Sequence, residues 1–433
     1  MVTENSQLWS SSVIEDIQAK AELGRYRIRG FSTFQKVPHF DDLVFLSTGL
    51  SRFPLEGYKE KCNTETVIGS RYAKEPLVLK TPVYISGMSY GALSKNAKVA
   101  LGKAASEVGT ATCTGDGGML DEERKASSKL IYQVLPSRYG FNPHHVVIAD
   151  ALEIVVGQGA KPGTGGMLMG MKVLDHIAKI RDLPTGVDQR SPTRHPDWLG
   201  PDDLAVKVEQ LREATDWRVP ISIKLGACRV ADDVKLAAKA GVDAIVIDGM
   251  QAGTGASAEL LLDHSGIPTM PAIVLAREAL KELGLLGEIT LIASGGIRSG
   301  ADAAKAIALG ADAVAIGIAS LIALNCNKEI PESNFLQEVG VPAGQCHHCQ
   351  TGKCPVGITT QDPKLEKRLD PDQGAERVAN FINSMTMEMA LLTRSLGKSD
   401  IHSLEPEDLA ALTIEASAMT KIPLAGTNKV FGE

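Results

Sequence analysis

The sequence is poor in aromatic residues, in long apolar runs and in any large excess of one charge. Aromatic side chains make up 4% of its 433 residues, whereas 42 residues are glycine. It has 45 basic and 52 acidic side chains, a net charge of −7, which argues against nucleic acid or an anionic membrane surface as the main partner. No apolar run approaches the length of a membrane span. Few aromatics and many glycines favour an α/β enzyme over an aromatic binding surface.

A secretion signal and a disulfide framework are also missing from the sequence. The first residues, MVTENSQLWSS, contain no basic region followed by an apolar core. Of the seven cysteines, Cys346, Cys349 and Cys354 are crowded together and the others are scattered. This distribution predicts a cytoplasmic protein with one cysteine-ligated site.

Residues 289–320 contain two consecutive strand–glycine–helix units. The apolar strands predicted over 289–293 and 313–316 are each followed by a glycine turn, Gly295-Gly296 and Gly317. Glycine lets backbone N–H groups approach a ligand closely, and the last two strands of a (β/α)8 barrel often bind a phosphate in this way. We therefore predict a phosphate site in this segment.

These patterns predict an α/β protein built around a (β/α)8 TIM barrel, with an N-terminal α/β extension and a C-terminal cysteine loop followed by helices. The extension is expected to cover one end of the barrel. The predicted boundaries are 1–80 for the extension, 81–322 for the barrel, 323–365 for the cysteine loop and 366–433 for the helical segment. Within the two ends of the chain, helices are predicted over 13–23, capped by Ser12, and over 405–419.

Two lysines are candidates for ligand binding. Lys224 ends the strand predicted over 221–225 and would point its ammonium group into the barrel mouth. One interpretation is a cation beside the ring of a bound flavin, and the alternative is a structural ion pair with a neighbouring aspartate. Lys161 lies alone in the glycine-rich loop 157–166, which suits anion binding. Cys113 has no evident paired base and is interpreted as a small buried residue.

The spacing Cys346-x2-Cys349-x4-Cys354, followed by proline, is the strongest metal-binding signal. Thiolates this close together, with proline after the last one, favour an iron–sulfur cluster. Zinc, held by the cysteines and a neighbouring histidine, is the rival interpretation, and a metal-free loop is the third. Cys326 could supply a fourth thiolate.

Eight motifs resemble, in order, the synthase domain of glutamate synthase. They are MSYGALSK (88–95), TGDGG (114–118), GQGAKPGTGG (157–166), IKL (223–225), GTGAS (253–257), SGGIRSG (294–300), IALNC (322–326) and CPVGITTQD (354–362). KVPHFDDLVFL near the N-terminus and LTIEASAM with IPLAGT near the C-terminus further resemble the stand-alone large-subunit group. That group includes the FMN-binding subunits of class III glutamate synthase and of N-methylglutamate synthase.

The resemblance implies a barrel that holds FMN beside an iron–sulfur cluster, of the 3Fe–4S type in the large glutamate synthases. At the flavin it places Met88, Ser89, Thr114, Gln133, Arg138 and Lys224, of which Arg138 and Lys224 are the predicted catalytic residues. At the flavin phosphate it places Gly295, Gly296 and Gly317, and at the substrate carboxylate Lys161. The predicted cluster ligands are Cys326, Cys346, Cys349 and Cys354, and four thiolates would also suit a 4Fe–4S cluster.

The sequence departs from the family pattern at Val155 and Met167, where the family has Lys and Gln in its 2-oxoglutarate site, and it has no glutaminase domain. The resemblance implies an oxidoreductase subunit of a glutamate synthase-type complex, in which reduced flavin delivers hydride to a 2-iminoglutarate-like intermediate. The amine would come from a glutaminase-like or other partner subunit, or from solution, and the electron donor is left open. An oligomer is expected.

The favoured specific reaction is synthesis of N-methylglutamate from glutamate and methylamine, and the alternative is glutamate synthesis from 2-oxoglutarate and ammonia. Two other classes stay open. An inosine-monophosphate dehydrogenase-like barrel would grip a phosphate without flavin, and a non-catalytic scaffold would use the cysteines to hold zinc.

Overall fold

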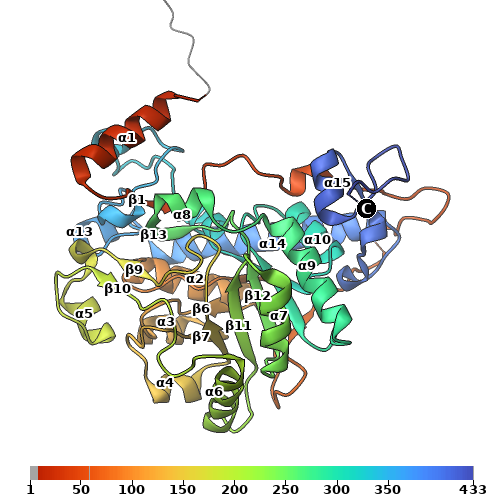
Figure 1. Cartoon of the computed structure of the whole chain (residues 1–433), viewed down its shortest axis with the longest axis horizontal. Helices are drawn as coiled ribbons and strands as arrows, with labels where there is room; N and C mark the ends of the chain where they lie inside the picture. The colour runs from red at the N-terminus through yellow and green to blue at the C-terminus, as the bar shows by residue number, and fades with distance from the viewer. Residues whose placement is uncertain (1–7, 58, 433) are drawn as a thin grey trace, which may run out of the picture.

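The computed structural model describes residues 8–57 and 59–432, and its centre is an eight-stranded parallel barrel surrounded by helices (Figure 1). Residues 1–7, on which most of the secretion-signal expectation depends, lie outside the described residues. The barrel strands are β5 (Val83–Ile85), β6 (Thr112–Cys113), β7 (Leu130–Val134), β8 (Ala151–Val155), β11 (Ile221–Gly226), β12 (Ala244–Asp248), β14 (Thr290–Ser294) and β15 (Ala313–Ile316).

Neighbouring barrel strands pair in parallel in the order β5-β15-β14-β12-β11-β8-β7-β6. The ring closes between its two ends, because the Ile85 N–H in β5 donates to the carbonyl of Ala111, next to β6, at 3.0 Å. This topology confirms the predicted (β/α)8 barrel. Among the described helices, none is long and apolar enough to cross a membrane.

Side chains inside the barrel change from apolar to polar toward the carboxyl ends of the strands. A buried apolar cluster fills the lower interior and includes Cys113, as predicted for that residue. On four strands a polar side chain lies two residues beyond a cluster member and faces the barrel mouth, because inward-facing positions alternate along a strand. These residues are Ser86, Gln133, Asp248 and Ser294, and Lys224 in β11 lines the same cavity.

Eight helices surround the barrel, and the last of them comes from far along the chain. The helix α14 lies against both α2 and α10 and buries apolar side chains, among them Val378, Ile382 and Met385. Residues beyond the predicted barrel segment 81–322 therefore complete the ring of helices. The eight are α2 (Lys95–Val108), α3 (Asp121–Ala126), α4 (Pro143–Ile148), α6 (Pro201–Ala214), α7 (Val230–Lys239), α9 (Thr269–Glu282), α10 (Gly300–Ala308) and α14 (Pro371–Ser395).

The N-terminal extension covers both ends of the barrel, not one as predicted. At the lower end, β3 (Thr66–Ile68) and β4 (Leu77–Leu79) form an antiparallel hairpin whose apolar side chains join the interior cluster. At the carboxyl ends of the strands, β1 (Ile28–Phe31) pairs antiparallel with β13 (Thr254–Ala258) in the loop after β12. The chain between these two parts passes over the barrel mouth.

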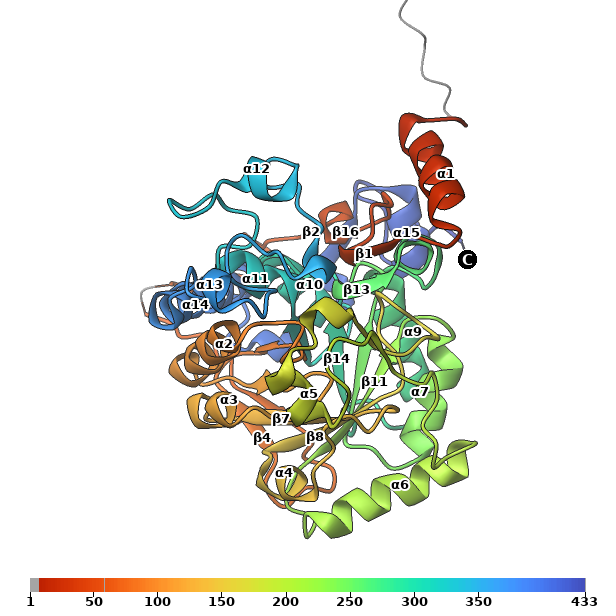
Figure 2. The ribbon, with the colours of Figure 1, turned by 90° about the vertical axis from the view of Figure 1, so that its left-hand side faces the viewer.

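The two ends of the chain differ from the predicted helices. Helix α1 (Ser11–Leu23) is capped by Ser10 rather than Ser12, buries no side chain, and projects from the molecule in Figure 2. The predicted helix over 405–419 is wrong in its first half. There β16 (Leu409–Ala411) pairs with β2 (Leu43–Phe45), and only α15 (Ile414–Thr420) is helical, because a tertiary strand pairing overrides local helix propensity.

The helices and strands described next lie in the loops around the barrel mouth. After β15 the chain forms α11 (Ile318–Ala323), α12 (Phe335–Val339), the 3-10 turn η3 (Cys349–Thr351) and α13 (Pro363–Glu366). The loop after β8 contains β9 (Met167–Leu168), α5 (Asp175–Arg181) and β10 (Gln189–Arg190), and α8 (Glu259–His264) follows β13. The turn η3 lies against both β1 and β13. The N-terminal extension and the cysteine segment therefore meet above the barrel.

Candidate active site

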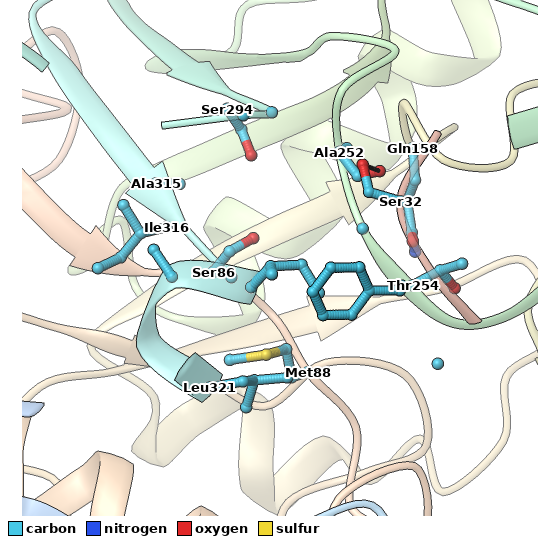
Figure 3. A pocket seen from close by; sticks show the side chains of 18 of the residues that line it. Ser32, Ser86, Met88, Gln158, Ala252, Thr254, Ser294, Ala315, Ile316 and Leu321 are labelled. Carbon is cyan, nitrogen blue, oxygen red and sulfur yellow. Dashed lines mark hydrogen bonds between the residues drawn. The ribbon is translucent and has the colours of Figure 1, made fainter. Parts of the chain in front are cut away.

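A cavity of about 960 Å³ lies at the carboxyl ends of the barrel strands. Its floor is the polar layer described above, and its walls are the loops that follow the strands. In Figure 3, Met88 and Leu321 lie together on one side, and Ser32, Ala252 and Gln158 lie on another. Enzymes built on this barrel bind their substrates at this end of the strands.

Lys224 lies at the cavity floor and is 5% exposed. Its Nζ is 3.2 Å from Ser86 Oγ and 3.6 Å from Asp248 Oδ2. Burial alone would lower the pKa of Lys224, but the carboxylates of Asp248 and Glu153 outweigh it, so the pKa is raised. The ion pair of the second interpretation is present, and the role of Lys224 beside a flavin stays a prediction. Lys224 forms an ion pair with an aspartate and also presents a fixed positive charge to the cavity.

Gln133 connects the cavity to a second buried carboxyl group. Its Nε2 donates to Glu153 Oε1 at 2.6 Å, and its side chain lines the cavity. Burial raises the pKa of Glu153, and the nearby Lys224 only partly opposes this. The floor thus combines one ammonium group with two carboxyl groups and an amide whose orientation Glu153 fixes.

The predicted phosphate turns open into the cavity. Gly295 and Gly296 have φ angles of +103° and +75°, which residues with a side chain rarely adopt. Gly317 precedes the first turn of α11, and a Cβ atom placed there would meet nothing within 4 Å. The first N–H groups of a helix have no partner within the helix, so this end suits a phosphate. All three glycines line the cavity.

His39 in the N-terminal extension holds the first phosphate turn. Its Nε2–H donates to the Gly296 carbonyl at 2.7 Å, and its Nδ1 accepts from Arg298 at 2.9 Å. Arg298 also pairs with Asp41 and Asp302. The ligand atoms of His39 and these two aspartates lie within 4.8 Å of one another, but the Arg298 guanidinium already bridges the three side chains. We therefore interpret them as a clamp on the turn rather than a metal site.

Lys161 and Arg181 bring two buried positive charges to another part of the cavity. Lys161 is 8% exposed, and burial lowers its pKa although Asp116 opposes this. Arg181 donates to the carbonyls of Tyr90 at 2.8 Å and Asp116 at 3.0 Å, while its buried Nε has no partner in the described chain. A buried donor without a partner and a neighbouring ammonium suit an anionic group such as a carboxylate.

Sequence reasoning missed Arg181, although one signal for it was present. Gly117 in the motif TGDGG has φ +106°, and a Cβ atom there would lie 2.5 Å from Arg181 Nε. The glycine therefore makes room for the guanidinium. His39 and Asp248 were also missed, because His39 lies in a segment without a recognised motif and Asp248 resembles an ordinary strand end.

Most of the predicted flavin and substrate residues line the cavity, but two do not. Met88, Ser89, Gln133, Lys224, Lys161 and the three glycines are among the lining residues. Thr114 is fully buried, and its hydroxyl accepts from the Gln133 N–H at 3.1 Å. Arg138 forms an ion pair with Asp197. Flavin contacts of Thr114 and Arg138 thus stay predictions without support from this geometry.

The four predicted metal ligands, Cys326, Cys346, Cys349 and Cys354, line one small cavity next to the large one. Burial, reinforced by Cys354, raises the pKa of the Cys349 thiol to about 12. Burial and the three other cysteines likewise raise the pKa of Cys326. Thiols arranged in this way ionise only if a cation compensates them, which is what a bound metal does.

No three of these four thiol sulfur atoms all lie within 4.8 Å of one another. Within the described ranges, the only three metal-type ligand atoms that all lie within 4.8 Å of one another are those of the His39 clamp. A tetrahedral zinc ion holds sulfur at about 2.3 Å and would draw the four sulfur atoms to about 4 Å from each other. An iron–sulfur cluster needs its thiolates farther apart, around a central space.

The two cavities share a wall. Cys326, Cys349 and Thr359 line both of them. Lys172 lies behind this wall, where its Nζ donates to the carbonyls of Ala92 at 2.6 Å and Cys349 at 3.3 Å. The short helix α11 connects the phosphate turn at Gly317 to the segment that carries Cys326. A redox group in each cavity would thus be close to the other, as the shared segment predicts.

The chain matches the conserved region in glutamate synthase over residues 40–399. It is 54% identical over 423 residues to a glutamate synthase large subunit-like protein of Rhizobium meliloti (strain 1021), which covers 98% of this chain and 96% of that protein. It is also 37% identical to an archaeal glutamate synthase (NADPH) of Methanocaldococcus jannaschii, over 93% of this chain and 82% of that protein.

Solved structures with a similar fold include two at low sequence identity. One is a monotopic membrane protein, (S)-mandelate dehydrogenase, with a TM-score of 0.52 at 14% identity, covering 86% of this chain and 89% of that one. Another is a flavocytochrome b2 with pyruvate bound, with a TM-score of 0.51 at 16% identity, covering 91% and 81%. At these identities the likeness establishes the fold alone.

Proposed function

Because the chain belongs to the glutamate synthase family of oxidoreductases, we propose that its large cavity holds FMN and that the adjoining cavity holds an iron–sulfur cluster. The observation that carries this proposal is the common wall, in which Cys326 and Cys349 line both cavities. Two redox groups separated by one layer of side chains can exchange electrons directly. A barrel that only binds a phosphate, or a cysteine loop that only binds zinc, would not require the two cavities to share a wall.

The residues present fit FMN at both of its ends. Gly295, Gly296 and Gly317 would hold the phosphate. The first two adopt positive φ angles that bring their backbone to the cavity, and Gly317 leaves open space where another residue would place its Cβ atom. Lys224 and Gln133 would face the ring from the cavity floor. When bound, FMN supplies hydride-transfer chemistry. The raised pKa of Lys224 keeps its ammonium charged, which favours an anionic reduced ring.

At the substrate, Lys161 and Arg181 would bind a carboxylate and so orient the reacting carbon toward the ring. Residues 31–39 cross part of the cavity and would limit the access of water to it. Ser32 fixes this crossing segment, because its hydroxyl donates to the carbonyls of Gln251 at 2.8 Å and Ala252 at 3.1 Å. The amine would arrive from a partner subunit or from solution, and the electrons through the cluster.

For the specific reaction, we favour N-methylglutamate synthesis from glutamate and methylamine, which releases ammonia. This exchange consumes no net electrons, because the hydride taken from the α-carbon of glutamate would return to the same carbon after methylamine has replaced ammonia. Met167 lines the cavity, and Val155 is buried in register with Lys224. Of the two, Met167 presents its apolar side chain to the cavity, which suits a methyl substituent better than a further carboxylate contact. Glutamate synthesis from 2-oxoglutarate and ammonia is the second candidate, favoured by the names of relatives such as the archaeal glutamate synthase (NADPH).

The absorption spectrum and metal content of the purified protein test the cofactor assignment. We expect flavin bands, a broad iron–sulfur absorbance, and iron with acid-labile sulfide. The variant Cys346→Ser should lose iron but keep flavin, because Cys346 lines the small cavity and not the large one. Zinc without iron would instead support the scaffold, and a protein that cannot be loaded with FMN would support the flavin-free phosphate-binding barrel.

Two parallel assays of the holoprotein distinguish the specific reactions. One contains glutamate and methylamine, and the other contains 2-oxoglutarate and ammonia, with products identified by mass spectrometry. The first starts with oxidised flavin, because glutamate must give up a hydride before one is returned to it, and the second starts with reduced flavin. N-methylglutamate in the first assay is the expected result. Product in the second assay alone would contradict the favoured reaction while leaving the family chemistry intact.

A further inference from the structure

Lys172 is a buried lysine without a carboxylate partner. It is 1% exposed and follows β9 in the loop after β8. Other buried lysines are neutralised within the protein, since Lys98 pairs with Glu123 at 2.6 Å and Lys224 with Asp248. Among the described residues, no aspartate or glutamate forms an ion pair with Lys172, whose ammonium group donates only to carbonyl oxygens there.

A buried ammonium group without an anion is costly, so its position indicates where an anion belongs. Another buried lysine without an ion pair among the described residues, Lys161, lines the large cavity, where it would face the proposed substrate carboxylate. Lys172 lies against the cysteine segment, since its Nζ donates to the Cys349 carbonyl at 3.3 Å and a Cβ atom at Gly352 would lie 3.2 Å from its Cγ. The groups of this segment that become anionic when they bind a metal are its cysteine thiols, so they would supply the anion that Lys172 lacks.

The same side chain also ties the cysteine segment to the flavin cavity. Its Nζ donates to the carbonyl of Ala92, which lines the large cavity in the loop after β5, and to the carbonyl of Cys349. Gly352 leaves room for the aliphatic part of the Lys172 side chain, because a Cβ atom at Gly352 would lie 3.2 Å from Lys172 Cγ. One ammonium group thus bridges the walls of both proposed redox sites.

We propose that Lys172 is the internal counter-ion of the iron–sulfur cluster and the residue that positions Cys349 against the flavin cavity. This inference rests on the proposed function, since it requires a cluster. When the cluster accepts one electron from its donor, it gains one negative charge. A fixed positive charge in a buried site stabilises that reduced state, so Lys172 raises the midpoint potential of the cluster and favours its reduction.

The test is a redox titration of the cluster in the holoprotein, followed by electron paramagnetic resonance. Lys172→Gln keeps a hydrogen-bond donor but removes the charge, and we expect a lower cluster potential with a smaller change at the flavin. Lys172→Arg keeps the charge and should restore the wild-type potential. Lys353→Gln removes an exposed charge next to Cys354 and should shift the potential less, because water screens it.

Each outcome of this titration supports or overturns the role of Lys172. An unchanged potential in Lys172→Gln, or a shift no larger than that of Lys353→Gln, would overturn it. Loss of iron from Lys172→Gln together with retained iron and potential in Lys172→Arg would support it, since only the charge differs. Loss of iron from both variants would also overturn it, as the residue would then be purely structural. If wild-type protein cannot hold a cluster, the proposed function itself fails.

Discussion

At the scale of single residues, Lys224 combines a structural ion pair with a proposed role at the flavin. Lys224→Met would leave the carboxylates of Asp248 and Glu153 buried without their cation. We expect the free energy of unfolding to fall by about 3–5 kcal/mol and flavin reduction to slow by roughly 100-fold. Chemical denaturation and stopped-flow absorbance measure the two effects.

A second variant separates these two roles of Lys224. In Lys224→Met/Asp248→Asn the unpaired aspartate charge is removed, so most of the lost stability should return. Flavin reduction should stay slow, because the ring still lacks its cation. If reduction recovers together with stability, Lys224 acts only as the partner of Asp248.

The phosphate turn gives a second prediction at the residue scale. At Gly296, φ is +75° and a Cβ atom would lie 2.8 Å from Gln251 Cβ, so Gly296→Val should abolish FMN retention. Gly284→Ala is the matched control, because its φ is +68° but a Cβ atom there meets nothing within 4 Å. The control should lose about 1–2 kcal/mol of stability and keep its flavin. Gel filtration and the flavin absorbance of the eluted protein distinguish the two variants.

The sequence could predict a site residue where a short sequence pattern marks it, and could not where its role depends on contacts with residues distant in the sequence. Gly295, Gly296 and Gly317 were predictable, because a glycine turn directly after an apolar strand is a local pattern. The cysteines were predictable for the same reason, by their spacing. Arg181 and Lys172 were not, since their roles come from partners that are distant in the sequence, such as Tyr90 for Arg181 and Ala92 for Lys172.

At the scale of secondary-structure elements, β1 connects the N-terminal extension to the cysteine segment. The Gly30 N–H donates to the His347 carbonyl at 3.2 Å, and a Cβ atom at Gly30 would lie 2.8 Å from Cys349 Cβ. Gly30→Ala should therefore displace η3, cost about 1–3 kcal/mol and lower the iron content, while FMN stays bound. Iron analysis against flavin content gives the result.

The control for this element is Gly24→Ala at the end of α1. Its φ is +61°, but a Cβ atom there meets nothing within 4 Å, and α1 buries no side chain. Iron and flavin should therefore match the wild type. Equal iron loss in both variants would show that β1 has no particular role in holding the cysteine segment.

Secondary structure was predicted correctly where the strand–glycine–helix pattern repeats along the chain. It was predicted wrongly where pairing with a strand distant in the sequence determines the structure. The strand 313–316 was predicted with its observed bounds, because the repeated order of apolar strand, glycine turn and helix defines the barrel. Residues 409–411 were predicted as part of a helix but form β16, since β2 from the N-terminal extension pairs with them. A local pattern contains no information about such a partner.

At the scale of the whole molecule, the described barrel is completed only by α14, after the cysteine segment. α14 buries Val378, Ile382, Met385 and Met389 at its contacts with the rest of the barrel. Burial of each such side chain contributes about 1.5–3 kcal/mol, so the group contributes roughly 10 kcal/mol, comparable with the total stability of many domains. The cysteine segment is thus an insertion between the last strand and the last helix of one folding unit.

A pair of truncations tests this organisation. A chain ending at residue 370 should fail to fold and should be recovered as aggregate, because α2 and α10 lose the helix that lies between them. A chain starting at residue 25, which lacks α1, should stay folded and retain flavin, since α1 buries no side chain. Circular dichroism, thermal unfolding and flavin absorbance report each result. A folded, flavin-binding chain that ends at residue 370 would show that the barrel does not need residues 371–433.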